Sequence, residues 1–203
     1  PHKSTFLAKK NIIGTGSIFP KIHVMYSGNI GLFYDLPNLF KVVEKFKDRE
    51  DVVFPFVGEG TLKNELMAYA EEHGKKNVCF IPYQEKSELA FSLNAADVHW
   101  IVNAEGVKGV SCPSKLYGIL STSKPALAVL EEGTEARNII ESTKCGYAVS
   151  PKDYKGVEEL IEKFITTDKD ELLKMGERGH EYMMAHLTRE ISIEKYRQEI
   201  ASC

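Results

Sequence analysis

Val52-Val53-Phe54-Pro55-Phe56-Val57 is a run of six apolar residues that stops at the turn Gly58-Glu59-Gly60. A strand with no polar alternation is typical of a parallel sheet that is covered on both faces. The sequence after the turn predicts a helix from about Leu62 to Gly74, where a glycine suits the residue just past a helix end. This segment is therefore a strand–turn–helix unit.

The same unit repeats along the chain. Further strands are predicted at 23–27, 78–81, 98–102, 126–130 and 147–149, and helices at 36–46, 86–96, 113–122, 134–146 and 157–164. Asp35 and Thr134 are predicted N-caps, and mostly helical sequence continues to the end. This alternation predicts an α/β, Rossmann-like parallel sheet with helices on both faces. We interpret residues 1–22 as a linker and residues 23–203 as one domain.

Composition narrows the possible functions. The chain has 203 residues, 26 Lys plus Arg, 29 Asp plus Glu and a formal net charge of −3, so no basic excess indicates a nucleic-acid partner. None of the four cysteines has CxxC spacing, and we predict no metal site and a reducing cytoplasm. We find neither a signal peptide nor an apolar run of the roughly 20 residues that cross a bilayer.

Glycine-bearing segments follow four predicted strands, at the edge where parallel sheets bind ligands. They are Gly28-Asn29-Ile30-Gly31, Gly58-Glu59-Gly60, Asn103-Ala104-Glu105-Gly106 and Glu131-Glu132-Gly133-Thr134. Each glycine alone is most simply a tight turn. Together, with Lys63 after one segment and Ser114-Lys115 at a helix start, they favour a diphosphate cradle. His99 and Trp100, inside an apolar strand, are interpreted as packed core residues.

Five segments, taken in order, resemble the C-terminal half of group-1 glycosyltransferases, which are retaining enzymes of the GT-B fold that use nucleotide sugars. The segments are Tyr26-Ser27-Gly28-Asn29-Ile30-Gly31, Val57-Gly58-Glu59-Gly60, Asn77-Val78-Cys79-Phe80-Ile81-Pro82-Tyr83, Ala95-Ala96-Asp97-Val98 and Pro113-Ser114-Lys115-Leu116-Tyr117. The resemblance runs from about residue 23 to residue 200. It points to the bacterial subgroup that builds O-antigen, capsule and exopolysaccharide.

The resemblance implies a set of donor-binding residues. Those expected beside the diphosphate are Gly28, Asn29, Ile30, Gly31, Gly58, Gly60 and Lys63. Glu132, Gly133 and Thr134 are expected to form the last loop on the phosphate side. Those expected beside the nucleobase are Ile81, Pro82 and Tyr83, and those near diphosphate and ribose are Ser111, Pro113, Ser114 and Lys115. Many relatives carry two glutamates eight positions apart, which fall here at Val110 and Gly118. Glu105 lies nearby and is the candidate catalytic carboxylate.

The resemblance also implies a function. The chain is expected to be the nucleotide-sugar-binding domain of a retaining hexosyltransferase in lipopolysaccharide or capsule synthesis, with a UDP-linked donor and no cofactor or metal. A separate N-terminal domain, expected to be absent here, would bind a glycan or lipid-linked acceptor. The isolated chain is then expected to transfer no sugar. The full-length protein is expected in the cytoplasm, at the inner face of the plasma membrane.

Two alternatives stay open. A nucleotide-sugar epimerase shares this fold but needs an acid and a base near the cleft, and no convincing set is visible. A non-catalytic α/β binding module, such as a response-regulator-like receiver, needs clustered acidic residues after the first strand and a lysine after the fifth. Ser27-Gly28-Asn29 and Glu131-Glu132 do not supply them.

Overall fold

The computed structural model describes residues 22–110 and 113–201. The predicted linker and Ser111 therefore lie outside the described residues, except that Ile22 belongs to the first strand rather than to the linker.

The described residues form one six-stranded sheet in the order β3-β2-β1-β4-β5-β6, with every pair parallel. The strands are β1 Ile22–Ser27, β2 Val52–Val57, β3 Val78–Ile81, β4 Val98–Val102, β5 Ala126–Val129 and β6 Gly146–Val149. The predicted α/β class and parallel sheet are confirmed. Because the chain runs outward from β1 to β3 and then returns to β4, the direction of winding switches between β1 and β4.

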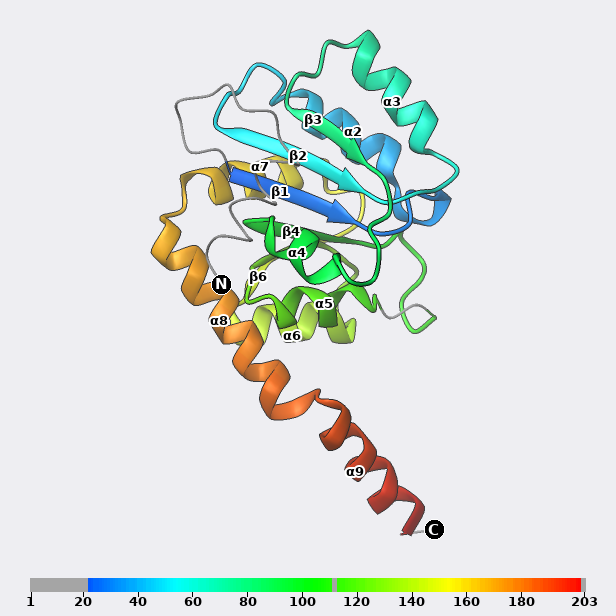
Figure 1. Cartoon of the computed structure of the whole chain (residues 1–203), viewed down its shortest axis with the longest axis vertical. Coiled ribbons are helices and arrows are strands. Elements are labelled where there is room, and N and C mark those ends of the chain that lie inside the picture. The colour runs from blue at the N-terminus through cyan, green and yellow to red at the C-terminus, as the bar shows by residue number, and fades with distance from the viewer. Residues whose placement is uncertain (1–21, 111–112, 202–203) are drawn as a thin grey trace.

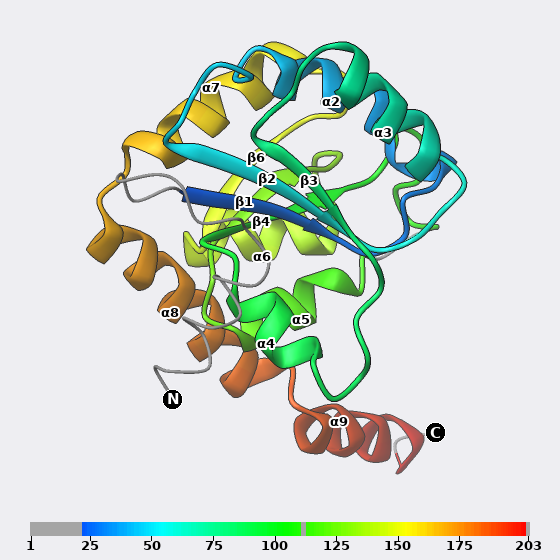
Figure 2. The same ribbon diagram turned by 45° about the horizontal axis from the view of Figure 1, so that its top comes forward.

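Helices cover both faces of the sheet (Figure 1, Figure 2). The helical elements are η1 Leu32–Tyr34, α2 Leu36–Glu44, α3 Lys63–Glu72, α4 Leu89–Asn94, α5 Lys115–Ser121, α6 Glu135–Thr143, α7 Tyr154–Thr166, α8 Lys169–His186 and α9 Arg189–Ala201. Figure 2 shows α2, α3 and α7 above the sheet and α4, α5 and α6 below it. The sequence placed the start of α4 three residues too early and that of α5 two residues too early.

Alternate strand residues supply hydrophobic clusters on both faces of the sheet, and a small third cluster joins Met25 and Val57 to Ala95 and Ala96. On one face, Tyr26 and Trp100 belong to the cluster that packs under α2, α3 and α7. On the other face, Ile101 packs with Leu116 of α5 and Ile140 of α6. The end of β1 lies between the helices of the two faces, so side chains from both faces can meet there.

The two predicted N-caps occupy their positions but do not cap. Asp35 has a left-handed backbone, with φ of 48° and ψ of 29°, and its carboxylate accepts hydrogen bonds from Asn38 Nδ2 and the Tyr154 hydroxyl, each at 2.8 Å. It therefore joins α2 to α7 instead of binding backbone amides. The Thr134 hydroxyl donates to the carbonyl of Glu131 at 2.9 Å.

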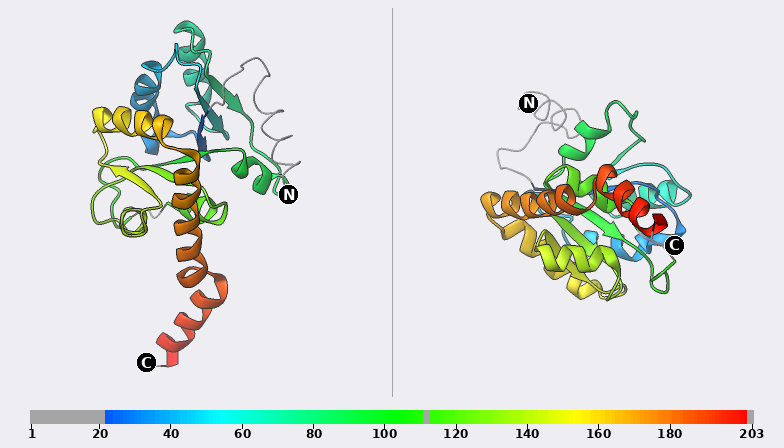
Figure 3. Two further views of the ribbon diagram at one scale, coloured as in Figure 1. Left: turned by 90° about the vertical axis from the view of Figure 1, so that its left-hand side faces the viewer. Right: turned by 90° about the horizontal axis from the view of Figure 1, so that it is seen from below.

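Helix α8 packs against α5 and α6, and α9 extends away from the body of the domain beyond it, as Figure 1 and Figure 3 show. The chain is helical to Ala201, as predicted, and no described residue of α9 is buried. Ile193, Tyr196 and Ile200 are exposed along α9. Within the described residues we find no helix with the length and hydropathy that crossing a bilayer requires.

Candidate functional site

A pocket of about 390 Å³ lies at the point where the winding of the sheet switches. Its lining comes from the end of β1 and the loop after it, from the region of α4, from β4 and from the start of α5. The lining residues are Ser27, Gly28, Asn29, Tyr34, Val57, Tyr83, Gln84, Leu89, Ser92, Leu93, His99, Trp100, Ser114, Lys115, Gly118 and Ile119. Ligands of open parallel sheets bind in the crevice at such a switch point.

Five predicted donor residues meet in this pocket: Gly28, Asn29, Tyr83, Ser114 and Lys115. Strand β1 delivers the first two and α5 the last two, because β1 and β4 are neighbours in the sheet and α5 follows β4. Tyr83 comes from the loop after β3 and is 65% exposed, so its ring stands at the mouth of the pocket. The sequence therefore identified residues from three separate segments that the fold brings together.

Lys115 carries the positive charge of the pocket. Its Nζ donates a hydrogen bond to the Tyr26 hydroxyl at 2.8 Å. The same nitrogen lies 4.0 Å from the centre of the Tyr26 ring and 4.4 Å from that of Tyr34. Burial lowers the pKa of Lys115 to about 8. Among the described residues, no carboxylate lies within ion-pair distance of this nitrogen, so the ammonium is available to an anionic ligand.

The lysine reaches Tyr26 by passing over Gly28. The backbone of Gly28 has φ of +141°, a conformation that side chains rarely adopt. A β-carbon there would lie 2.4 Å from Lys115 Cε and 2.9 Å from Nζ. The turn therefore favours glycine, and any side chain at position 28 would displace the end of the lysine from this path.

The inner wall of the pocket is polar but uncharged. His99 is 1% exposed, and its Nε2 lies 3.0 Å from the carbonyl of Leu93. Burial lowers its pKa to about 4, so the imidazole is neutral at pH 7. Ser92 Oγ and Trp100 Nε1 are buried without a hydrogen-bond partner among the described residues. The interpretation of His99 and Trp100 as buried residues is correct, but both also line the pocket.

The glycines after β2 serve the backbone rather than the pocket. A β-carbon on Gly58 would lie 1.9 Å from the carbonyl oxygen of Gly28, and one on Gly60 would lie 2.1 Å from that of Ile30. The Ile30 amide donates to the Glu59 carbonyl at 2.8 Å, and the Leu62 amide donates to the Ile30 carbonyl at 3.0 Å. The two loops are thus in direct backbone contact, which accounts for both glycines without a ligand.

Several other predicted residues lie outside the pocket lining: Ile30, Gly31, Gly58, Gly60, Lys63, Ile81, Pro82, Pro113, Glu132, Gly133 and Thr134. Lys63 pairs with Glu59 at 2.6 Å, so its charge is already compensated. A β-carbon on Gly133 would lie 2.8 Å from Lys108 Nζ, which donates to the carbonyl of Glu132 at 2.6 Å. The loop after β5 is thus tied to the loop after β4, and its role toward a phosphate stays a prediction.

Glu105, the candidate catalytic carboxylate, is exposed and does not line the pocket. It forms an ion pair with Lys152 on the loop after β6. In the described part of the chain, no group of three or more His, Cys, Asp or Glu side chains is arranged to hold a metal ion.

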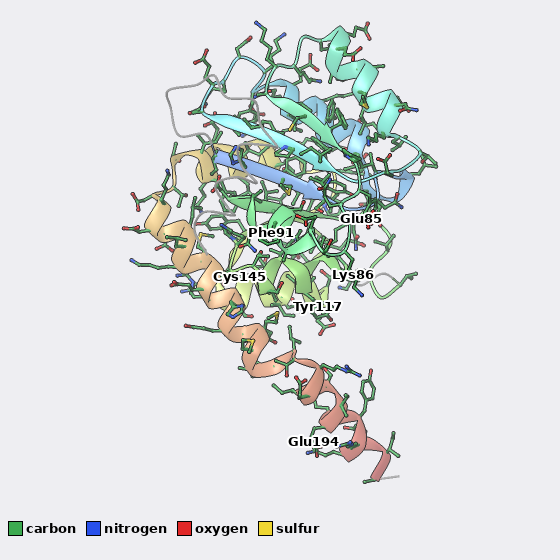
Figure 4. The ribbon with its side chains drawn as sticks, in the orientation of Figure 1. Glu85, Lys86, Phe91, Tyr117, Cys145 and Glu194 are labelled. Carbon is green, nitrogen blue, oxygen red and sulfur yellow. The ribbon has the colours of Figure 1, made fainter. Side chains whose placement is uncertain are left out.

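Sequence reasoning missed part of the pocket wall. Gln84 precedes α4, and Leu89, Ser92 and Leu93 belong to it. Figure 4 shows Phe91 on the same helix and Tyr117 on α5. Glu85 and Lys86, labelled in the same view, lie just before α4. The helix is only six residues long and had no sharp sequence boundary. The available signal was its position directly after Tyr83.

Residues 18–182, most of the chain, match the sequence model of the family called glycosyl transferases group 1. The chain belongs to this family. It is 29% identical over 171 residues to WbjE of Pseudomonas aeruginosa, named a probable glycosyltransferase, covering 84% of this chain and 42% of WbjE. It is 33% identical over 138 residues to WcaI of Escherichia coli K12, whose name assigns it to colanic acid biosynthesis, covering 68% of this chain and 33% of WcaI.

The chain thus spans less than half the length of these two curated relatives. Among solved structures, HepE (Alr3699) of Anabaena, crystallised with UDP and glucose, superposes with a TM-score of 0.79 at 12% identity. The superposition covers all of this chain (100%) and 53% of HepE. At this identity the likeness shows the fold, which is that of one half of a GT-B glycosyltransferase.

Proposed function

We propose that this group-1 glycosyltransferase chain is the domain that binds the nucleotide-sugar donor in a retaining hexosyltransferase of cell-surface polysaccharide synthesis. The observation that carries the proposal is Lys115 Nζ, an ammonium at the switch-point pocket with no carboxylate partner among the described residues. A diphosphate supplies the missing negative charge. The pocket also offers a mostly uncharged wall for the nucleoside.

The pocket residues suggest how a donor lies. Lys115 and the loop at Gly28 and Asn29 suit the diphosphate, since charge-assisted hydrogen bonds are strong and glycine permits close approach. Tyr83 also lines the pocket, and its exposed ring can pack against a base. HepE, which shares this fold, was crystallised with UDP and glucose, and this supports a UDP-linked donor.

The chemical contribution of this domain is electrostatic. As the bond between sugar and diphosphate breaks, negative charge grows on the leaving phosphate, and an ammonium fixed beforehand stabilises that charge. In the mechanism that the resemblance implies, the same phosphate takes the proton of the acceptor hydroxyl, so the new bond forms on the face the diphosphate leaves. No catalytic carboxylate or metal is proposed here. Glu105 keeps at most a supporting role, because its partner is Lys152.

We propose that a further domain, of the kind that the longer curated relatives have room for, binds the acceptor. The curated relatives extend far beyond this chain, and WcaI is named for colanic acid, an association that supports a polysaccharide acceptor or a lipid-linked precursor. We place the full-length protein in the cytoplasm, at the inner face of the membrane. No pocket observation favours the epimerase alternative, since none of the described lining residues is a carboxylic acid.

Calorimetric titration of the 203-residue chain with UDP, UDP-GlcNAc, GDP and ADP tests the proposal. We expect binding with a preference for one base, and weaker binding of the matching nucleoside. Binding of none of these nucleotides at millimolar concentration would overturn it. Transfer activity is then tested separately, in full-length protein with a lipid-linked acceptor.

A further inference from the structure

Tyr26 contacts both Lys115 and the Gly28–Asn29 loop, the two features that we assign to the diphosphate. Its hydroxyl accepts the hydrogen bond from Lys115 Nζ at 2.8 Å and donates its own hydrogen to the carbonyl of Asn29 at 2.6 Å. One phenol thus connects a side chain of α5 with the loop after β1. The tyrosine is buried, at 1% exposure, and is not itself part of the pocket lining.

The Tyr26 ring is held on several sides. It packs against Tyr34 in an edge-on arrangement with 6.4 Å between ring centres and against Phe56 at 5.9 Å. It also belongs to the main hydrophobic core. Because a ring packed in this way cannot swing, its hydroxyl marks a fixed point in space.

A lysine needs such a fixed point. Its four-carbon stem is flexible, and its ammonium has three donors that can point in many directions. In this pocket the described residues provide one hydrogen-bond partner for the ammonium, the Tyr26 hydroxyl, and two aromatic faces. One donor is therefore used for orientation, and two stay available for phosphate oxygens.

We propose that Tyr26 is a positioning residue of the donor site, which holds the Lys115 ammonium and the Gly28–Asn29 loop in the arrangement that receives the diphosphate. The inference rests on the proposed function and adds a residue that acts through Lys115. A purely structural tyrosine would need a partner only for its own hydrogen, and the carbonyl of Asn29 already provides one.

The test uses Tyr26→Phe, which removes the hydroxyl and keeps the ring. By calorimetry, UDP affinity should fall about three- to tenfold, the equivalent of one hydrogen bond, while uridine affinity stays unchanged. Because the hydroxyl favours the charged form of Lys115, the pH above which UDP affinity declines should move to lower pH in the variant. Tyr154→Phe is the matched control, since it also removes a bonded phenol hydroxyl, outside the pocket, and should leave both results unchanged.

A double-mutant cycle decides whether Tyr26 acts through the lysine. In a Lys115→Met background, Tyr26→Phe should cost clearly less UDP affinity than in the unaltered chain, because only the bond to the Asn29 carbonyl is then lost. Three results would each overturn the inference while leaving the proposed function intact. They are an equal loss of UDP affinity with and without Lys115, a loss of uridine affinity equal to that of UDP, and a pH dependence of UDP affinity that does not move. If the unaltered chain binds no nucleotide, the proposed function fails and the inference fails with it.

Discussion

The side chain of Lys115 crosses directly over the α-carbon of Gly28, so closely that a β-carbon at position 28 would lie 2.4 Å from Lys115 Cε. The contact joins the turn after β1 to the first residue of α5. It links a glycine, which the sequence marked as a turn, to the cation that we assign to the diphosphate.

Replacing Gly28 with alanine should therefore displace the lysine. We expect UDP affinity to fall at least tenfold, because the methyl group occupies the path of the lysine stem, and the positive φ adds strain of about 1 to 3 kcal/mol. Gly106→Ala is a suitable control, since Gly106 also has a positive φ but no atom within 4 Å of the added carbon. An alanine at position 28 that bound UDP as well as glycine would contradict this account of the contact.

Lys115→Met should weaken binding and strengthen the fold. Loss of a charge-assisted hydrogen bond predicts a drop in UDP affinity of about 10- to 100-fold, with uridine affinity little changed. A buried ammonium without a carboxylate partner destabilises the fold. The free energy of unfolding of the Lys115→Met variant should therefore be higher, by about 1 to 3 kcal/mol. That gain should be largest below pH 8 and shrink as the pH rises, since the buried lysine then loses its proton while the unfolded lysine keeps it. Lys155→Met, an exposed lysine on α7, should change neither quantity.

UDP affinity should depend on pH above neutrality. The pKa of Lys115 in the free chain is about 8, and a bound diphosphate raises it because the phosphate charge favours the ammonium. Between the two values, binding takes up a proton, so the dissociation constant should be flat from pH 7 to about 8 and then rise by up to about tenfold per pH unit. Proton uptake can be read from calorimetry in buffers of different ionisation enthalpy. A constant affinity up to pH 9.5 would show that Lys115 is not the titrating group.

Gly118 of α5 lines the pocket, and its missing side chain leaves space there. A β-carbon there would meet only Leu93, at an ordinary 3.5 Å. Gly118→Ala should therefore bind UDP normally and stabilise the helix by about 1 kcal/mol. Gly118→Leu should fill the pocket and weaken uridine and UDP by the same factor, unlike any change at Lys115. If Gly118→Leu bound uridine normally, the nucleoside would have to lie elsewhere.

The strands and the parallel sheet could be predicted because the strands are short, mainly apolar runs and four of the six are followed by a glycine-bearing turn. The pairing of Tyr26 with Lys115 could not, since it joins residues 89 positions apart and depends on β1 lying beside β4. The packing role of Gly58 could not be predicted either, for a related reason. Its missing side chain makes room for the Gly28 carbonyl, and a backbone–backbone approach leaves no trace in residue type beyond the glycine itself.

A crystal structure of this chain with UDP would show whether Lys115 binds the diphosphate. We expect the diphosphate in the pocket at the β1–β4 switch point, with a phosphate oxygen within hydrogen-bond distance of Lys115 Nζ, and the uracil on the side of Tyr83. UDP bound away from this pocket, or bound within it with the diphosphate out of reach of Lys115, would contradict the account.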